Sequence, residues 1–382
     1  MKKLSAVGLT LALIAATAQG AQPPSRDPLF QVAGAFRDAA VHDDHLYLLA
    51  GEVAAGQPDV LVLHLGGGKV GQQVSRYTAR YAPLALSAAA GWMFLTEGDR
   101  GLEVVDIRDS AEPRWAAHVP LEGYSHRAVL RDGTALVASG FGGLHLLDIQ
   151  NPGRPSLLSS YQAYPPPQNA GEDGTESVGL FAGEDLPESL LPMASPSDES
   201  GYFRPDDLPA YEGNEEEITP QDIRDREGVL DVALDGAIAY LAYGSAGIVI
   251  LDISNPRNPR RIGGYQTEWP AESIAVRDGR AYLTSGVGGL LILDITDPIR
   301  PKKLAQLRTR CYPKRLAVRY GFVYLADGLC GDKGLLVIDV QDPATPRVVE
   351  RLTGRIENVR VLGDRVVSLG VHKARGYSLF SR

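Results

Sequence analysis

A short apolar motif that ends in aspartate recurs along the chain and limits the folds open to it. The run Gly-Leu-Glu-Val-Val-Asp-Ile at residues 101–107 has close copies that end at residues 149, 253, 295 and 340. Successive aspartates are separated by 42, 104, 42 and 45 residues. A period near 42 built from short apolar runs is typical of a β-propeller, with one four-stranded blade per repeat. The repeated aspartates are Asp106, Asp148, Asp252, Asp294 and Asp339.

Two weaker copies complete the series. Steps of 42 residues from the outermost aspartates lead back to His64 and forward to Ser381, which keep the apolar rhythm without the aspartate. The long interval equals one repeat plus an insertion of 62 residues. The sequence therefore predicts an all-β fold, a seven-bladed β-propeller of four-stranded blades.

One repeat shows the expected strands clearly. We expect strands at 272–277, 280–284, 290–295 and 302–307, with Asp278-Gly279 as the tight turn of the first hairpin. The repeated aspartate precedes a proline-bracketed turn such as Asn255-Pro-Arg-Asn-Pro259. Asp side chains accept backbone N–H groups in such bends, so we predict a structural role for it.

The two ends of the chain are predicted to meet. The last copy has strands at 356–362 and 365–369 and a third strand, and then the chain stops before a fourth. An isolated strand at 29–34 aligns with the outer strand of another repeat. We therefore expect the last blade to be closed by the N-terminal strand, which would leave no free sheet edge.

These residues resemble a known family. The pattern Leu-x-Ile-x-Asp-Ile, followed by Ser, Thr or Gln, then Asn or Asp, and Pro-x-x-Pro, resembles the LVIVD repeat. The resemblance covers nearly all of the chain after its first residues, apart from the insertion. It implies a propeller found in exported bacterial and archaeal proteins. It implies no catalytic residues, because scaffold and function are separate in propellers.

The start of the chain has the features of a secretory signal peptide. Lys2 and Lys3 precede an apolar stretch over 4–16, and small residues follow. We expect a signal peptide at residues 1–20 and one propeller domain at 21–382. No cysteine stands directly after the expected cleavage sites, Ala16-Thr-Ala18 and Ala18-Gln-Gly20. No other apolar run is long enough to span a membrane. The expected location is periplasmic or extracellular, without a lipid anchor.

The insertion carries most of the acidic charge. Residues 162–227 hold seventeen Asp or Glu against three Arg, in a chain with a formal net charge of −9. Such a composition is typical of a disordered, solubilising loop, and a segment of this length can also serve as a lid. The acidic balance argues against a nucleic-acid partner, which would need a basic face.

Charged residues occupy equivalent positions at the start of the inner strands, which lie on one face of the propeller around the mouth of its channel. The insertion joins the blades on this same face. We therefore predict a binding site at the channel mouth. The alternative is a solvated rim whose charges pair with one another. The candidate residues are Arg37, Asp38, His126, Arg127, Glu272, Lys314, Arg315, Glu357 and Asn358.

The cysteines and the glycine-rich runs limit the kinds of site that the chain can form. Cys311 and Cys330 fall on adjacent loops of the same face, and an exported chain with two cysteines is expected to form one disulfide. We expect no cofactor, because the glycine-rich runs lie between strands with no helix to follow. We expect no metal either, because His42-Asp-Asp-His45 aligns with an ordinary hairpin turn on the opposite face. No nucleophile elbow occurs.

Three functions remain open. The leading one is an exported, non-catalytic binding scaffold that uses the insertion-bearing face and the channel mouth. Its partner would be another envelope or extracellular protein or a small anionic ligand, and we expect a monomer. The alternatives are a lactonase-like propeller hydrolase with its site at the mouth and a structural cell-envelope or surface protein. The cations among the candidate residues argue against a divalent metal in the hydrolase.

Overall fold

The structure, a computed structural model, describes residues 29–51, 59–66, 68–162, 228–309, 312–327, 334–363, 365–370 and 373–378. One compact unit comprises residues 1–163 and 224–382, and its described part is the propeller. The expected signal peptide, the expected insertion beyond Gln162, and Cys311 and Cys330 lie outside the described residues.

The described strands form seven four-stranded antiparallel sheets. The inner strands are β2 (Phe36–His42), β6 (Ala85–Ala89), β10 (Arg127–Arg131), β14 (Asp231–Asp235), β18 (Ala271–Arg277), β22 (Arg315–Arg319) and β26 (Ile356–Leu362). The second strands are β3 (His45–Ala50), β7 (Trp92–Thr96), β11 (Thr134–Ala138), β15 (Ile238–Ala242), β19 (Arg280–Ser285), β23 (Phe322–Ala326) and β27 (Arg365–Gly370). The third strands are β4 (Asp59–His64), β8 (Leu102–Asp106), β12 (Leu144–Asp148), β16 (Ile248–Asp252), β20 (Leu290–Asp294), β24 (Leu335–Asp339) and β28 (Lys373–Ser378). The outer strands are β5 (Gln73–Thr78), β9 (Arg114–Val119), β13 (Ser156–Tyr161), β17 (Arg260–Tyr265), β21 (Lys302–Leu307), β25 (Arg347–Leu352) and β1 (Phe30–Ala33).

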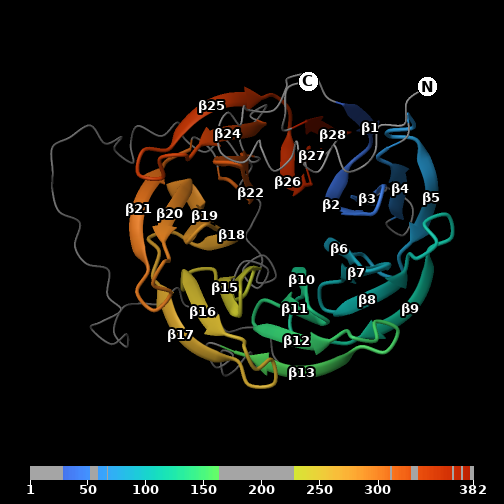
Figure 1. Cartoon of the computed structure of the whole chain (residues 1–382), viewed down its shortest axis with the longest axis horizontal. Helices are drawn as coiled ribbons and strands as arrows, with labels where there is room; N and C mark the ends of the chain where they lie inside the picture. Colours follow the sequence, from blue (N-terminus) through green and yellow to red (C-terminus); the bar gives the residue numbers. More distant parts are fainter. Residues whose placement is uncertain are drawn as a thin grey trace, which may run out of the picture. The chain divides into compact units, whose positions relative to one another are not determined.

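The blades follow one another in a ring, with their inner strands toward its centre (Figure 1). We number them 1 to 7 from the blade β2–β5 to the blade that contains β26–β28. Strand β1 is hydrogen-bonded to β28, with Phe30 opposite Gly376, so the N-terminal strand completes blade 7. The predicted seven-bladed propeller and its closure are confirmed.

The last copy of the repeat was placed three residues too far along the chain. In blade 5 the repeated aspartate Asp294 pairs with Arg280, the first residue of the second strand. The equivalent pair in blade 7 joins Arg365 and Ser378, not Ser381. Two of these three residues are missing between Asp339 and the end of the inner strand of blade 7 at Leu362, and one between Leu362 and Ser378, relative to the matching steps of blade 5. A single turn of 3-10 helix, η3 (Gly286–Gly288), also interrupts the loop before β20 and was not expected.

The repeat motif is explained by packing and by a turn. The third strands are almost fully buried between neighbouring blades, which accounts for their apolar runs. Each repeated aspartate accepts the backbone N–H two residues later, from Arg108, Gln150, Ser254, Thr296 and Gln341, at 2.9–3.0 Å. The predicted structural role of the aspartate is therefore confirmed.

The glycine that precedes the third strand also has a physical reason. In blade 4 it is Gly247, whose φ is +76°, and a Cβ there would lie 2.4 Å from the Tyr265 carbonyl oxygen. Both the positive φ and the close backbone approach exclude a side chain. Among the described residues, no helix is long and apolar enough to cross a membrane.

Candidate binding site at the channel mouth

The inner strands of a propeller all run in the same direction, so their first residues meet at one end of the channel. A cavity of about 250 Å³ lies there. Its lining includes seven of the nine residues predicted from the sequence: Arg37, Asp38, Arg127, Lys314, Arg315, Glu357 and Asn358. Leu84, Ala85 and Arg360 complete the lining. The shared register therefore brings these side chains from blades 1, 2, 3, 6 and 7 together.

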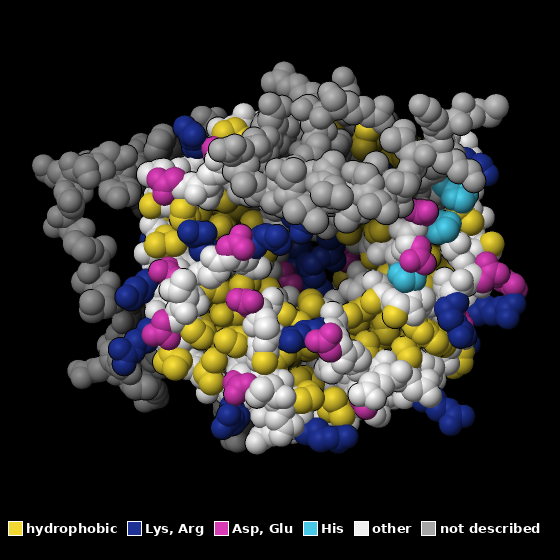
Figure 2. All heavy atoms as spheres, viewed as in Figure 1, with side chains coloured by type: hydrophobic (Ala, Val, Ile, Leu, Met, Phe, Trp, Pro, Cys, Tyr) yellow, Lys and Arg dark blue, Asp and Glu magenta, His cyan; other side chains and the backbone are white. Residues whose placement is uncertain are grey.

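The lining is strongly cationic. Five Lys or Arg residues face two carboxylates, although the whole chain carries a formal net charge of −9. Figure 2 shows dark blue Lys and Arg side chains gathered at the central opening of the ring. Because a hollow with low-dielectric walls focuses the field of its charges, this arrangement attracts anions.

Asp38 belongs to the wall of the cavity. Its carboxylate is fully buried and accepts N–H groups from Ala39 at 2.9 Å and from Leu86 of blade 2 at 3.0 Å. Arg360 of blade 7 binds both carboxylate oxygens, with Nε at 2.6 Å from one of them. Asp38 thus joins three blades and holds the Arg360 guanidinium in place.

The charge of Asp38 is maintained at neutral pH. Burial raises the pKa of its carboxyl to about 6, while the charges of Arg127 and Arg315 and the two backbone N–H groups act in the opposite direction. A group with this pKa is mostly ionised at pH 7. The Asp38–Arg360 pair is therefore neutral overall.

Asn358 is also a wall residue. Only 8% of it is exposed, and its amide donates to the Arg37 carbonyl at 2.8 Å and to Asp38 at 3.1 Å. Its side-chain oxygen accepts the N–H of Val359. Asn358 therefore closes the contact between blades 7 and 1.

Asp231 was missed by the sequence analysis. It begins the inner strand of blade 4 at the register of Asp38 and is 1% exposed. Its oxygens accept N–H groups of Val232 at 2.9 Å and Ile274 at 3.2 Å, and the Ser273 hydroxyl at 2.9 Å. Like Asp38, it joins its own inner strand to that of the next blade.

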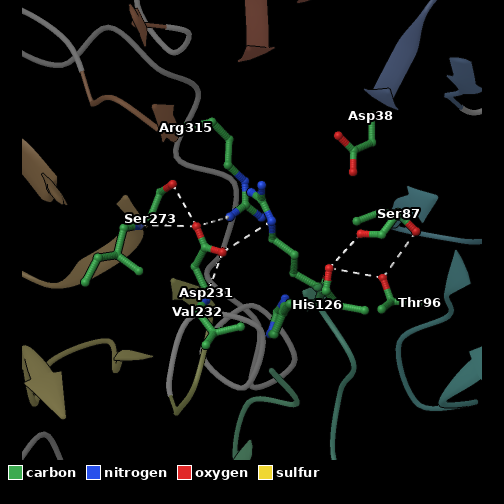
Figure 3. A network of polar contacts seen from close by, with 12 residues as sticks. Asp38, Ser87, Thr96, His126, Asp231, Val232, Ser273 and Arg315 are labelled. Carbon is green, nitrogen blue, oxygen red and sulfur yellow. Dashed lines mark hydrogen bonds and ion pairs between the residues drawn. The ribbon is translucent and has the colours of Figure 1, made fainter. Parts of the chain in front are cut away.

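Two guanidiniums converge on this carboxylate. Nε of Arg127 lies 3.4 Å from one Asp231 oxygen, and Nη1 of Arg315 lies 3.6 Å from the other. Figure 3 shows Arg315 reaching toward Asp231, with Ser273 on the far side of the carboxylate. Since blades 3 and 6 are three blades apart, one buried anion holds cations from two separate parts of the ring.

Two predicted residues do not line the cavity. Glu272 accepts the hydroxyl hydrogen of Tyr312 instead. His126 packs edge-on against Tyr124, and its Nε2 is buried without a hydrogen bond among the described residues. Burial, assisted by the charge of Arg315, lowers the pKa of His126 to about 3, so this imidazole is neutral at pH 7.

A β-bulge occurs at this register in three blades. In blades 1, 5 and 7 the pairing of the inner strand skips one residue, which is Arg37, Glu272 and Glu357 respectively. A bulge leaves the extra residue unpaired and changes the direction of its side chain. The bulge does not by itself decide the outcome, because Arg37 and Glu357 line the cavity whereas Glu272 contacts Tyr312. Within the described residues, no group of three or more His, Cys, Asp or Glu side chains is arranged to hold a metal ion.

Comparisons with known proteins agree with this architecture. Four segments, 122–163, 228–267, 270–306 and 312–353, match the family model of the LVIVD repeat. They correspond to blades 3 to 6. The chain matches no protein of curated function.

Several solved structures have a similar fold. A chain of a mitotic checkpoint complex has 8% identity and a TM-score of 0.61, with 100% of this chain and 98% of that chain covered. The propeller domain of Cps50 (Swd1) from Myceliophteria thermophila has 10% identity and a TM-score of 0.58, with 92% and 99% covered. BamB from Moraxella catarrhalis has 12% identity and a TM-score of 0.52, with 93% and 92% covered. Likeness at this level of identity shows the fold alone.

Proposed function

We propose that this seven-bladed β-propeller, four of whose blades match the LVIVD repeat, is an exported, non-catalytic binding protein for a small anionic ligand that binds in the cationic cavity at the channel mouth. The observation that carries the proposal is the convergence of five cations on one hollow in an acidic protein. The export part rests on residues 1–20, whose sequence has the features of a signal peptide.

The cations of the cavity are held ready for a ligand. Arg127 and Arg315 are only 19% and 25% exposed, and their shared contact with Asp231 limits their movement. A site whose donors are already ordered loses little entropy on binding. Lys314 takes part in no ion pair within the described part of the chain and adds a further positive charge.

Anion-dependent stabilisation tests the proposal. A ligand at a hundred times its Kd stabilises a folded protein by about 2.7 kcal/mol. We expect small polyvalent anions to raise the melting temperature at constant ionic strength. The effect should be lost in Arg127→Gln and kept in Arg300→Gln, which alters an exposed arginine in the β20–β21 turn. Equal responses of both variants, or no response of the parent, would contradict it.

A second function, docking of another protein on the same face, is supported by exposed apolar side chains. Tyr81, Phe141, Trp269 and Val287 lie on mouth-face loops and are 36–45% exposed. Exposed aromatic residues are enriched in protein interfaces. A photo-crosslinking amino acid at Phe141 should capture a defined partner that the same group at Ile299, on the opposite face, does not capture. Identical adducts from both positions would count against docking.

A further inference from the structure

The hydrogen-bonding state of Arg127 and Arg315 identifies the kind of anion. This step rests on the proposed function, because it concerns the ligand of the same cavity. Both oxygens of Asp231 already accept hydrogen bonds at 2.9–3.2 Å from Val232, Ser273 and Ile274. The two guanidiniums stand farther away, at 3.4 and 3.6 Å. Charge-assisted hydrogen bonds between N–H and carboxylate are usually about 2.7–2.9 Å long.

Asp231 therefore offsets the positive charge of Arg127 and Arg315 without accepting a hydrogen bond from either guanidinium. Neither guanidinium donates a hydrogen bond among the described residues, although both arginines line the cavity. Donors at a cavity wall that have no protein acceptor favour a ligand that supplies acceptors. Arg360, by contrast, is fully engaged with Asp38.

The direction of approach of the two guanidiniums limits the shape of the ligand. Arg127 comes from blade 3 and Arg315 from blade 6, and each carries a planar fork of N–H donors. A carboxylate presents two oxygens in one plane, which suits one fork. A tetrahedral oxyanion presents at least three oxygens in different directions and can accept from two forks and from the Lys314 ammonium.

The charge of the lining and the volume of the cavity also favour a tetrahedral oxyanion. The lining has five cations and two carboxylates, and the buried Asp231 adds a third carboxylate beside Arg127 and Arg315. The excess is then about two positive charges, which a dianion matches better than a monoanion. The cavity of about 250 Å³ lies below the range of about 300–1,000 Å³ typical of pockets for drug-sized ligands. It suits a single tetrahedral group with little attached to it.

We infer that the channel mouth binds the phosphoryl group of inorganic phosphate or a small phosphomonoester between Arg127 and Arg315. In this arrangement Arg127 and Arg315 donate to the phosphoryl oxygens from opposite walls. Asp231 positions the two guanidiniums and does not contact the ligand.

Calorimetric titration of the full-length protein with five anions tests the inference. The anions are inorganic phosphate, glycerol 3-phosphate, sulfate, acetate and succinate, at constant ionic strength and neutral pH. We expect the two phosphates to bind about ten-fold or more tightly than acetate and succinate, which corresponds to about 1.4 kcal/mol. Sulfate, which has the same shape, should compete.

Substitutions then assign the binding to the two arginines. Arg127→Gln and Arg315→Gln should each weaken phosphate binding by about ten-fold or more, whereas Arg300→Gln should have no effect. Arg315→Lys keeps the charge and removes the fork, so it should reduce the preference for phosphate over succinate. It also serves as the informative variant if a Gln substitution prevents folding.

The outcomes separate this inference from the proposed function. Arginine-dependent binding of succinate without phosphate would overturn the phosphoryl assignment and leave the proposed anion site standing. Absence of binding for all five anions would overturn both. Binding to phosphatidylcholine vesicles only when they contain phosphatidate, lost in Arg315→Gln, would identify a lipid headgroup as the phosphate source. Absence of vesicle binding alongside phosphate binding would identify a soluble phosphate.

Discussion

At the scale of single residues, the most unusual feature outside the channel is a buried pair of acids in blade 2. Glu97 and Glu103 have fully buried side chains. Glu103 accepts hydrogen bonds from the Tyr77 hydroxyl and from the backbone N–H of Arg80. Burial, with the adjacent Glu103, raises the pKa of Glu97 to about 9. Glu97 is therefore protonated at neutral pH.

This assignment predicts a pH-dependent stability. The unfolded chain loses the Glu97 proton near pH 4.3, whereas the folded protein keeps it to about pH 9. Between these values the folded state binds more protons, so its stability falls as pH rises, by up to about 1.4 kcal/mol per pH unit. Glu97→Gln cannot lose this proton. We expect its advantage over the parent in thermal melts to grow from pH 5 to pH 9.

The control for this experiment is Glu112→Gln, since the Glu112 side chain is 64% exposed and pairs with Arg114 at the surface. Its difference from the parent should not change with pH across this range. Parallel stability curves for Glu97→Gln and the parent would show that Glu97 is already ionised in the folded protein.

At the scale of secondary-structure elements, the glycine that precedes the third strand in blades 2 to 6 is predicted to tolerate no side chain. Gly247→Ala would place a Cβ 2.4 Å from a backbone oxygen at a φ of +76°. Strain of this kind costs about 1–3 kcal/mol before any clash is counted. Gly236→Ala, at a φ of +55° in open space, isolates the conformational cost. Chemical denaturation should show a clearly larger loss for Gly247→Ala, and equal losses would refute the close-approach argument.

The strand that closes the ring gives a second prediction at this scale. Phe30 in β1 is 7% exposed and packs in the cluster shared by blades 7 and 1, whereas its neighbour Leu29 is 40% exposed. Phe30→Ala should cost about 3–5 kcal/mol, and Leu29→Ala much less. Deletion of residues 29–34 would expose the edge of β28 and should cause aggregation. A deletion variant that melts like the parent would contradict the closure.

At the scale of the whole molecule, the seven sheets are complete without residues 163–227. Every strand of every sheet lies in the described part of the chain, and β13 and β14 belong to full four-stranded blades. We therefore predict that replacing residues 165–225 with a short Gly-Ser linker leaves the melting temperature unchanged. A large drop on circular dichroism would mean that the fold depends on this segment.

The fold could be predicted almost completely from the sequence, because it rests on a local pattern that is repeated. Blade 5 shows this well, since its outer strand at 302–307 coincides with the expected range. Each aspartate turn, each glycine and each apolar strand has a short-range cause. The position of Ser378 could not be predicted, because it depends on how far the last blade departs from the period of 42.

The binding site was predicted less completely, because some of its side chains are placed by contacts between residues far apart in the sequence. The register of the inner strands located most of the cavity lining, but the hydrogen bond between Glu272 and Tyr312 joins residues 40 positions apart and has no local signal. Arg360 was missed although it lies two residues after Asn358 and hence on the same face of β26. Asp231 follows the insertion directly, and alignment of the Asp235-Gly236 hairpin would have found it.

The central claim is that Arg127 and Arg315 hold a tetrahedral oxyanion at the channel mouth, and the position of a heavy oxyanion tests it most directly. Crystals soaked in tungstate or selenate would show the anion by its anomalous scattering. The account predicts the strongest anomalous peak inside the cavity, within hydrogen-bonding distance of both guanidiniums. A channel mouth without a peak, with density only at exposed arginines of the outer strands, would contradict it.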